Sequence, residues 1–374
     1  MKIGIDISQI VYGTGVSVYT KNLVENLLQI DKENEYKLFF SSLRQALPSD
    51  FKINSKKAKV KLFPIPPTLL EPLWNKWHWL AIERLLGHVD VFHSSDWTQP
   101  PSKAAKVTTI HDFGFLKYPE VAHPKIKAVM ERRFKWIKKE VDLIIAVSQA
   151  TKKDIMEILN IPEGKIRVIY EAVSEDVNQV KDKKIIEKVK KKYGFRGNYL
   201  LSVATLEPRK NLKRIIEAFK MLKAKDLKLV IVGKQGWDDS LPKLNFKRQT
   251  SNIIFTGYIS KEDKAALYSG ATCLVYSSLY ECFGLPVLEA LKCGCPVLTS
   301  NISSLPEVAG QAAILVDPLD VGEIAKGLSE VINNKEKRKD LIKKGFVQVE
   351  KFSWEKAARE TLKVYEEAYR HQKN

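Results

Sequence analysis

Two glutamates eight residues apart form the pair in this sequence that is most suggestive of chemistry. Glu281 and Glu289 flank a segment in which Pro286 suits the first turn of a helix, so Glu289 is expected near the start of that helix. An ionised carboxylate only accepts hydrogen bonds, and two of them along one wall suit a hydroxyl-rich ligand. Backbone amides around Gly284 and Leu285 could meet an anion or a sugar oxygen. The alternative for Glu289 is a charge that only stabilises the helix start.

Residues 204–211, ATLEPRKN, place two cations where a strand is followed by a helix. Arg209 and Lys210 are expected in the first turn of that helix, with Asn211 as a cap. The helix dipole disfavours cations at this end, and a locally unfavourable arrangement is typical of a functional site. A forked guanidinium and a compact ammonium together would bind a diphosphate. A solvated surface pair is the alternative.

The N-terminal part of the chain adds a glycine turn and a histidine. Gly13 and Gly15 precede the first expected helix, where backbone amides can approach an oxyanion. The dinucleotide fingerprint is incomplete, because Val18 stands where a third glycine would be, and a simple tight turn is the alternative. His111 follows the apolar run 107–110 directly. Ligands of parallel sheets bind at the carboxyl ends of the strands, although a lone histidine is more often structural.

No metal site is expected. The cysteines lack the spacing of a zinc site and are predicted to be small buried side chains; they are Cys273, Cys282, Cys293 and Cys295. Asp238 and Asp239 follow Trp237 and are interpreted as solvated acids at a loop or helix start. A chain of this length with four cysteines has no disulfide framework, which favours a reduced, cytosolic compartment.

Alternating strands and helices must position these residues. Apolar runs predict strands in the first half at 3–7, 36–40, 60–63, 107–110, 143–147 and 167–170. A second set is predicted at 199–204, 227–232, 272–276 and 296–299. The charged stretch 174–192 between them is expected to hold a linker and a lead-in helix. Two alternating halves predict an α/β protein with two doubly wound, Rossmann-like domains, and a ligand in the cleft that they face.

Composition and charge limit the classes of function. The chain has 374 residues, 44% hydrophobic and 28% charged, which excludes a disordered chain and fits two or three domains. No apolar stretch is long enough for a membrane-spanning helix, and the start is interpreted as a strand rather than a signal peptide. The net charge is +18, and residues 51–250 hold 41 Lys and Arg against 22 Asp and Glu. Such a surface attracts nucleic acid, anionic lipid or phosphorylated substrates, or is merely a solvated face.

Taken together, the motifs resemble those of the retaining family 4 glycosyltransferases, also called glycosyltransferase group 1. The resemblance rests on EPRKN at 207–211 and on ECFGLPVLEALKCGCPVLTSNISSLPEVAG at 281–310, which contains the pair Glu281 and Glu289. The turn at 14–19 and the pair His111 and Asp112 are similar to the mannosyltransferase-like branch. Cys282 departs from the family, which commonly has Gly or another small residue there, and this leaves details of the sugar pocket open.

The resemblance implies a GT-B architecture. Residues 1–172, with a returning C-terminal helix at 353–374, would form an N-terminal Rossmann-like domain that binds the acceptor. Residues 173–352 would form the Rossmann-like domain that binds the nucleotide sugar.

The family pattern also implies roles for single residues. Arg209 and Lys210 would bind the donor diphosphate, and Glu289 would hold the ribose hydroxyls. The donor sugar would be held by Glu281 and by the backbone of Phe283, Gly284 and Leu285. From the N-terminal domain, Gly15 would approach the diphosphate and His111 would contact the donor sugar near the reacting carbon. On this basis His111 and Glu281 are the expected catalytic residues.

The implied reaction is hexosyl transfer with retention of configuration and without a metal. Mannose is the first choice, carried by GDP-mannose or by a UDP-sugar. The expected acceptor is a glycan or a lipid-linked sugar in cell-surface polysaccharide or glycolipid synthesis. The alternatives are a sugar-nucleotide epimerase on the same fold and a non-enzymatic protein that binds polyanions or membranes. No RNA-binding motif with interleaved aromatic residues appears, so nucleic acid is not an expected partner.

A membrane surface is a further expected partner of a cytoplasmic enzyme. Residues 74–79 contain three tryptophans and a lysine, and residues 125–139 contain seven cations. Indole rings favour the membrane interface and cations favour anionic lipid, so peripheral binding to the inner face of the membrane is expected. The alternative is that the tryptophans belong to the core and the cations are spread around a helix.

Overall fold

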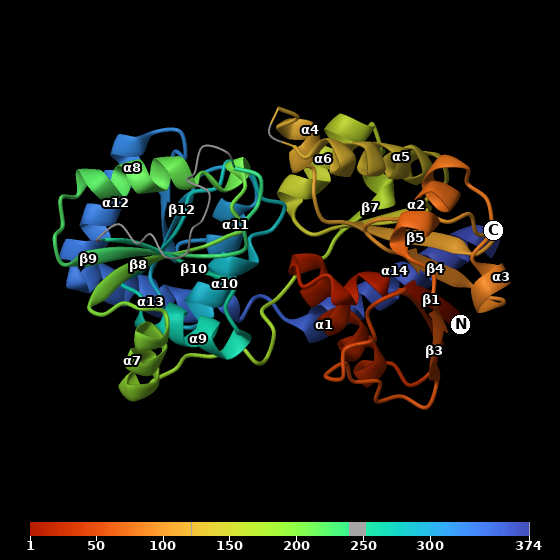
Figure 1. Cartoon of the computed structure of the whole chain (residues 1–374). Helices are drawn as coiled ribbons and strands as arrows, with labels where there is room; N and C mark the ends of the chain where they lie inside the picture. The colour runs from red at the N-terminus through yellow and green to blue at the C-terminus, as the bar shows by residue number, and fades with distance from the viewer. Residues whose placement is uncertain (121, 239–251, 374) are drawn as a thin grey trace. The chain divides into compact units, whose positions relative to one another are not determined.

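A computed structural model of the chain describes residues 1–120, 122–238 and 252–373. It contains two compact units (Figure 1). Unit 1 comprises Met1–Glu171 and Ser353–Asn374, and unit 2 comprises Ala172–Phe352. Each unit is built on one parallel sheet with helices, so the prediction of two doubly wound α/β units is confirmed.

Unit 1 has a seven-stranded sheet in the order β3-β2-β1-β4-β5-β6-β7, with every pair parallel. The strands are β1 Lys2–Asp6, β2 Glu35–Ser41, β3 Ala58–Phe63, β4 Val91–Ser94, β5 Ala105–Ile110, β6 Leu143–Ala146 and β7 Ile166–Val168. β1 lies between β2 and β4, with Ile3 opposite Tyr36 on one side and Val91 on the other. The order of the strands therefore reverses between β1 and β4, which is where ligands of such sheets bind.

The helices of unit 1 come from both ends of the chain. The longer ones are α1 Gly15–Ile30, α5 Pro124–Glu140, α6 Gln149–Leu159 and α14 Trp354–Lys373. The shorter ones are α2 Pro67–Glu71, α3 Glu83–Leu86 and α4 Gly114–Lys117, with single turns at Ser8–Val11, Pro72–Lys76 and Glu163–Lys165. α14, blue in Figure 1, packs on α1 and on strands β4, β5 and β6. The C-terminal helix is thus part of the unit that begins the chain.

Unit 2 has a six-stranded parallel sheet in the order β10-β9-β8-β11-β12-β13. Its strands are β8 Asn198–Val203, β9 Leu227–Val232, β10 Ile253–Gly257, β11 Cys273–Tyr276, β12 Val297–Ser300 and β13 Ala313–Val316. Its helices are α7 Lys183–Lys192, α8 Leu212–Met221, α9 Lys261–Gly270, α10 Leu285–Lys292, α11 Leu305–Ala309, α12 Val321–Asn333 and α13 Lys335–Val349. Here the strand order reverses between β8 and β11.

Continuous apolar strands explain the parallel sheets. All four residues of β6, β11 and β12 are buried, as expected for strands covered on both faces. The four cysteines are buried free thiols, which confirms their predicted structural role. Within the described residues, no helix is both long and apolar enough to span a bilayer.

Candidate active site

The strand reversal in unit 2 brings the predicted cations and the first predicted glutamate together. Arg209 and Lys210 lie in a 3-10 turn, Pro208–Lys210, that follows β8, and Glu281 lies in the loop after β11. β8 and β11 are neighbours in the sheet. Their carboxyl ends therefore form the edge where a ligand is expected.

Four charged side chains form a compact group at this edge, which we call the charge cluster: Glu207, Arg209, Lys210 and Glu281. Lys210 Nζ donates to Glu281 Oε1 at 2.6 Å and to the Tyr276 hydroxyl at 3.1 Å. The Arg209 guanidinium donates to Glu281 Oε2 at 3.1 Å and to Glu207 Oε1 at 2.7 Å. The side chains of Arg209 and Lys210 are only 16% and 12% exposed. With two cations and two carboxylates, the cluster carries no net formal charge.

Mutual attraction keeps Glu281 and Lys210 ionised although both side chains are shielded from solvent. Burial is the largest influence on the pKa of Glu281 and raises it, but Lys210 and Arg209 outweigh burial and lower that pKa to about 2. Burial and Arg209 both lower the pKa of Lys210, yet Glu281, Tyr276 and Glu207 together raise it above its ordinary value. Glu281 and Lys210 therefore stay charged at neutral pH.

The local backbone differs from the expectation in one respect. Arg209 and Lys210 were expected in the first turn of the helix, but α8 begins at Leu212, and Asn211 is left-handed with a φ of 59°. Asn211 makes no side-chain cap. Its Nδ2 donates to the carbonyl oxygens of Ser277 at 2.9 Å and Pro318 at 2.7 Å. Asn211 thus occupies the predicted N-cap position of a helix that begins at Leu212, but its amide joins neighbouring loops instead of bonding to the helix start.

The loop before α10 is shaped by one glycine and one serine. Gly284 has a φ of 108°, and a Cβ there would lie 2.7 Å from Leu305 Cδ2, so only glycine fits without a shift. Ser304 Oγ donates to the carbonyl oxygens of Glu281 at 2.9 Å and Phe283 at 2.7 Å. α10 then begins at Leu285, with Pro286 in its first turn as predicted.

Glu289 has its own partners, distinct from those of Glu281. Its Oε1 accepts from Lys264 Nζ at 2.6 Å and its Oε2 accepts from the Tyr268 hydroxyl at 2.9 Å. Both partners belong to α9, which packs against α10. A carboxylate oxygen has two lone pairs, so each oxygen of Glu289 retains capacity for one more donor.

In unit 1, Gly15 is the first residue of α1. Thr14 precedes it as the N-cap and exchanges reciprocal contacts with Ser17, whose Oγ also donates to the Gln9 carbonyl oxygen at 2.8 Å. Gly13 has a φ of 65°, which glycine tolerates best. The glycine turn is thus a capped helix start.

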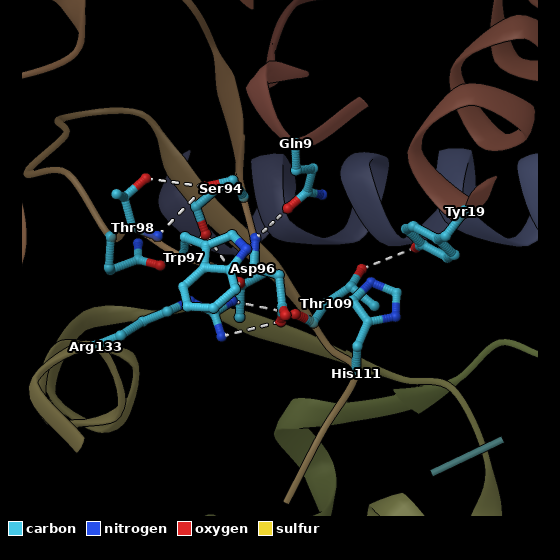
Figure 2. Close-up of polar contacts among 12 residues, drawn as sticks. Gln9, Tyr19, Ser94, Asp96, Trp97, Thr98, Thr109, His111 and Arg133 are labelled. Atoms are coloured by element: carbon cyan, nitrogen blue, oxygen red, sulfur yellow. Dashed lines mark hydrogen bonds and ion pairs between the residues drawn. The ribbon is translucent and has the colours of Figure 1, made fainter. Parts of the chain in front are cut away.

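His111 lies directly after β5, as predicted. Its Nδ1 is 3.0 Å from Glu171 Oε1, and its ring meets the ring of Tyr19 edge to face at 4.3 Å between centroids. Tyr19 in turn hydrogen-bonds to Thr109 at 2.9 Å. Figure 2 shows Tyr19, Thr109 and His111 grouped at the end of this strand.

A buried arginine of α5 was not predicted as part of a site. Arg133 is fully buried, pairs with Asp96 at 3.4 Å and donates to Thr108 Oγ1 at 2.7 Å and the Thr109 carbonyl oxygen at 3.1 Å (Figure 2). From the sequence, Arg133 is one of the seven cations of residues 125–139. Arg133 lies in the same apolar stripe of α5 as Met130 and Ile137, which are both buried. This position is the signal that could have distinguished Arg133 from the other cations of the helix.

A cavity of about 500 Å³ opens where β1 and β4 end, at the strand reversal of unit 1. Its lining includes Asp6, Ser8, Tyr12, Trp97 and Thr98. The Tyr12 and Trp97 rings lie edge to face at 6.4 Å. Burial raises the pKa of Asp6, although hydrogen bonds from Ser8 oppose that rise. Asp6 was not among the predicted site residues, and its place at the end of the first strand is the available signal.

Among the described residues, no three His, Cys, Asp or Glu side chains are close enough to hold a metal ion. Asp238 is buried, which corrects the expectation that it is solvated. Asp239 lies outside the described residues.

The chain has two Rossmann-like units, each built on a parallel sheet with polar side chains at its strand reversal. This is the α/β architecture of the GT-B glycosyltransferases. Two family models match the chain: "Glycosyl transferases group 1" over residues 184–348 and "Glycosyltransferase Family 4" over residues 13–177. The chain is also 30% identical over 371 residues to O-antigen chain mannosyltransferase B of Escherichia coli. This match covers 94% of this chain and 96% of that protein. The protein belongs to glycosyltransferase family 4, group 1, and is a glycosyltransferase.

Solved structures share the fold. Sucrose-phosphate synthase from Thermosynechococcus elongatus matches with a TM-score of 0.75 and 19% identity, over 99% of this chain and 100% of that one. Anabaena HepE in complex with UDP-glucose matches with a TM-score of 0.71 and 16% identity, over 98% of this chain and 100% of that one. At these identities the likeness concerns the fold alone.

Proposed function

We propose that the protein transfers a hexose, with mannose as the first choice, from a nucleotide sugar to a glycan acceptor with retention of configuration. The charge cluster of unit 2 carries this proposal. Arg209 and Lys210 lie at a strand reversal with most of each side chain shielded from solvent, and their orientation is fixed in advance by Glu207 and Glu281. Cations that are already oriented stabilise a developing diphosphate charge without reorganisation when the glycosidic bond breaks.

The remaining donor contacts follow from the family pattern. Glu289, with a free lone pair on each oxygen, accepts the ribose hydroxyls. Glu281 and the backbone of Phe283, Gly284 and Leu285 hold the donor sugar. Gly15 approaches the diphosphate and His111 contacts the sugar near the reacting carbon.

The reaction needs no side-chain nucleophile. The leaving phosphate takes the proton of the acceptor hydroxyl on the same face of the sugar, which retains the configuration at the anomeric carbon. Arg209 and Lys210 take the place of a metal as the cations that stabilise the leaving diphosphate, so transfer is expected to survive a chelator. Loss of activity in chelator, with recovery in magnesium or manganese, would contradict this part of the proposal.

The cavity of unit 1 is proposed as the acceptor site. Tyr12 and Trp97 offer aromatic surface for a sugar ring, and Asp6 and Thr98 offer oxygen atoms to its hydroxyls. A glycan acceptor agrees with the name of the Escherichia coli relative, an O-antigen chain mannosyltransferase. Polysaccharide synthesis is therefore the expected context.

A thermal-shift screen of nucleotide sugars followed by a transfer assay tests the proposal. A bound donor raises the melting temperature by mass action, and GDP-mannose is expected to give the largest shift. UDP-glucose, the ligand of Anabaena HepE, is the comparison. Lys213→Ala, which removes an exposed cation three residues from Lys210, is the matched control for Lys210→Ala. If the nucleotide sugar raised the melting temperature of these two variants equally, the proposed role of the charge cluster in donor binding would be wrong. Epimerised or hydrolysed donor in the absence of acceptor would indicate an epimerase instead.

Peripheral membrane binding is part of the same proposal. The surface proposed to contact the membrane contains fewer residues than the sequence suggested. Trp74 is fully buried, whereas Trp77 and Trp79 are 65% and 62% exposed. The His78 ring stacks on Trp136 of α5 at 3.6 Å. This contact joins the exposed tryptophans to the face of α5 that carries exposed lysines, and Arg133 is excluded from that face by its burial.

Vesicle sedimentation tests this surface. The wild type is expected to pellet with anionic vesicles in a salt-sensitive way, and the double variant Trp77→Ala with Trp79→Ala is expected to pellet less. Equal pelleting with neutral vesicles, or none with anionic ones, would leave an enzyme that acts at the cytoplasmic side without membrane contact.

A further inference from the structure

Glu171 and His111 are joined although 60 residues separate them in the chain. Glu171 Oε1 lies 3.0 Å from His111 Nδ1, and each side chain is only 6% exposed. Glu171 comes shortly after β7 and is the last residue of the first segment of unit 1. The pair therefore lies within one unit, at the carboxyl ends of two strands.

The other ring nitrogen of His111 points to a ligand. His111 Nε2 is buried and has no hydrogen-bond partner among the described residues. A buried polar atom of this kind is costly unless a partner is supplied. A bound substrate is the natural source of that partner for a side chain at the end of a parallel strand.

We infer that Glu171 is a positioning residue: it holds the proton of His111 on Nδ1 and so presents Nε2 as a hydrogen-bond acceptor to a hydroxyl of the bound sugar. The inference rests on the proposed function, in which His111 contacts the donor sugar. It adds the tautomer of His111, the group that selects it and the kind of substrate atom that His111 meets.

The chemistry of the two side chains supports this assignment. An ionised carboxylate only accepts hydrogen bonds, so the atom of His111 that faces Glu171 must carry a hydrogen. In the neutral ring the hydrogen on Nδ1 leaves a lone pair on Nε2. That lone pair can accept from a sugar hydroxyl, whereas an imidazolium would present a second donor. The neutral ring is thus the competent form.

The rest of the ring is held in place from several elements. The edge contact with Tyr19 of α1 fixes one side of the imidazole. The hydroxyl of Thr109 connects Tyr19, at 2.9 Å, to His93 Nε2 of β4, at 3.0 Å. His93 Nδ1 in turn lies 2.7 Å from the hydroxyl of Tyr365 on α14.

The main chain at His111 is held by a second carboxylate. The backbone N–H of His111 hydrogen-bonds to Asp96, and Asp96 pairs with the fully buried Arg133 (Figure 2). Ring and backbone are therefore each fixed by an acidic side chain. The titratable or charged groups around the imidazole are Tyr19, His93, Asp96, Asp112, Arg133 and Glu171.

The variant Glu171→Gln separates charge from hydrogen bonding. The Gln carbonyl oxygen still accepts from Nδ1, so the tautomer is kept and kcat at high pH stays close to that of the wild type. The negative charge that favours imidazolium is lost. The acidic limb of the kcat/KM profile is therefore expected to move to lower pH.

The variant Glu171→Leu removes the hydrogen bond as well. It is expected to lower kcat about tenfold, the effect of one lost hydrogen bond, with little change in the donor KM. Glu163→Gln is the matched control, because Glu163 is an exposed carboxylate of the same unit that pairs with Lys152. Its profile is expected to match that of the wild type.

Nitrogen NMR of the ring gives a readout that does not depend on activity. With 15N-labelled histidine, and His111→Asn to assign the signals, the wild type is expected to show a protonated Nδ1 and an unprotonated Nε2 at high pH. Glu171→Leu is expected to show a mixture of tautomers, and Glu171→Gln is expected to keep the wild-type pattern.

Any of three results would overturn the inference. The first is a wild-type His111 ring that is protonated on Nε2 alone, and the second is an acidic limb of the kcat/KM profile that is unchanged in Glu171→Gln. The third is a Glu171→Leu variant whose His111 tautomer shifts while its kcat stays that of the wild type. Failure of the proposed function is a different result, because a wild type without transfer from any nucleotide sugar would still show its His111 tautomer by NMR.

Discussion

Lys210 Nζ and Glu281 Oε1 are 2.6 Å apart although 71 residues separate them in the chain. Neighbouring parallel strands explain the contact, because β8 ends before Lys210 and β11 ends before Glu281. Each charge compensates for the burial of the other. Arg209 also pairs with Glu281 and Glu207 lies 3.8 Å from Lys210, so removing one partner would leave the other less well compensated, which is costly for a charge shielded from solvent.

Arg209→Ala and Lys210→Ala are each expected to reduce transition-state stabilisation by roughly 2–4 kcal/mol, because a preorganised cation at the leaving diphosphate is lost. The measurement is kcat/KM for the nucleotide sugar. Unfolding midpoints should also fall, since Glu281 loses a partner. Lys210→Met with full activity and the wild-type melting temperature would refute both roles.

Glu289→Gln is expected to raise the donor KM more than it lowers kcat. The reason is that an amide accepts hydrogen bonds from the ribose hydroxyls more weakly than a carboxylate does, while the side chain keeps its shape. Glu262→Gln on the exposed face of α9 serves as the control. Since Glu289 also holds Lys264 and Tyr268, the melting temperature must be recorded with the kinetics. An unchanged donor KM in a folded variant argues against the ribose role.

Acid is expected to destabilise the charge cluster. The pKa of Glu281 is about 2 in the folded protein against an ordinary value of 4.5. Its contribution to stability is therefore complete above about 4.5 and is lost as the pH falls towards 2. Urea-unfolding midpoints of the wild type and Glu281→Gln should converge across this window. Parallel curves for the two proteins would contradict the assignment.

His93 gives unit 1 a different pH dependence. Burial, with smaller contributions from His111 and Arg133, lowers the pKa of His93 from 6.5 to about 3. Between these values only the unfolded chain binds the proton, so stability falls with falling pH by up to about 1.4 kcal/mol per unit. His93→Gln should flatten the change in unfolding free energy between pH 7 and 5. An equally steep change in the variant would rule out His93 as its source.

Much of the fold and the core of the site in unit 2 could be predicted from the sequence. Apolar runs such as 143–147 indicate buried strands because parallel strands are covered on both faces. Residues that follow two strands are predicted at the carboxyl edge of the sheet, and the observed pairing of β8 with β11 places Lys210 beside Glu281 there. Pro286 marks the start of α10 because its fixed φ suits that position.

Contacts set by tertiary structure could not be predicted in the same way. Asn211 has a left-handed backbone, and its side-chain amide donates to the carbonyl oxygens of Ser277 and Pro318. No local pattern indicates these distant partners. Three nearby tryptophans look alike in the sequence, yet Trp74 is buried and donates to the Leu80 carbonyl oxygen at 3.0 Å, while Trp77 is exposed. The partner of His111 lies 60 residues away, beyond the reach of any periodicity.

The place of α14 also sets the order in which the protein can be completed during synthesis. A ribosome releases residues 172–352 before Trp354–Lys373 emerges, so unit 2 is the first unit whose whole chain is available for folding. Until then unit 1 lacks the helix that packs on α1, β4, β5 and β6, and His93 lacks the hydroxyl of Tyr365. A nascent chain that stops short of this helix would therefore have a complete second unit and an unfinished first one.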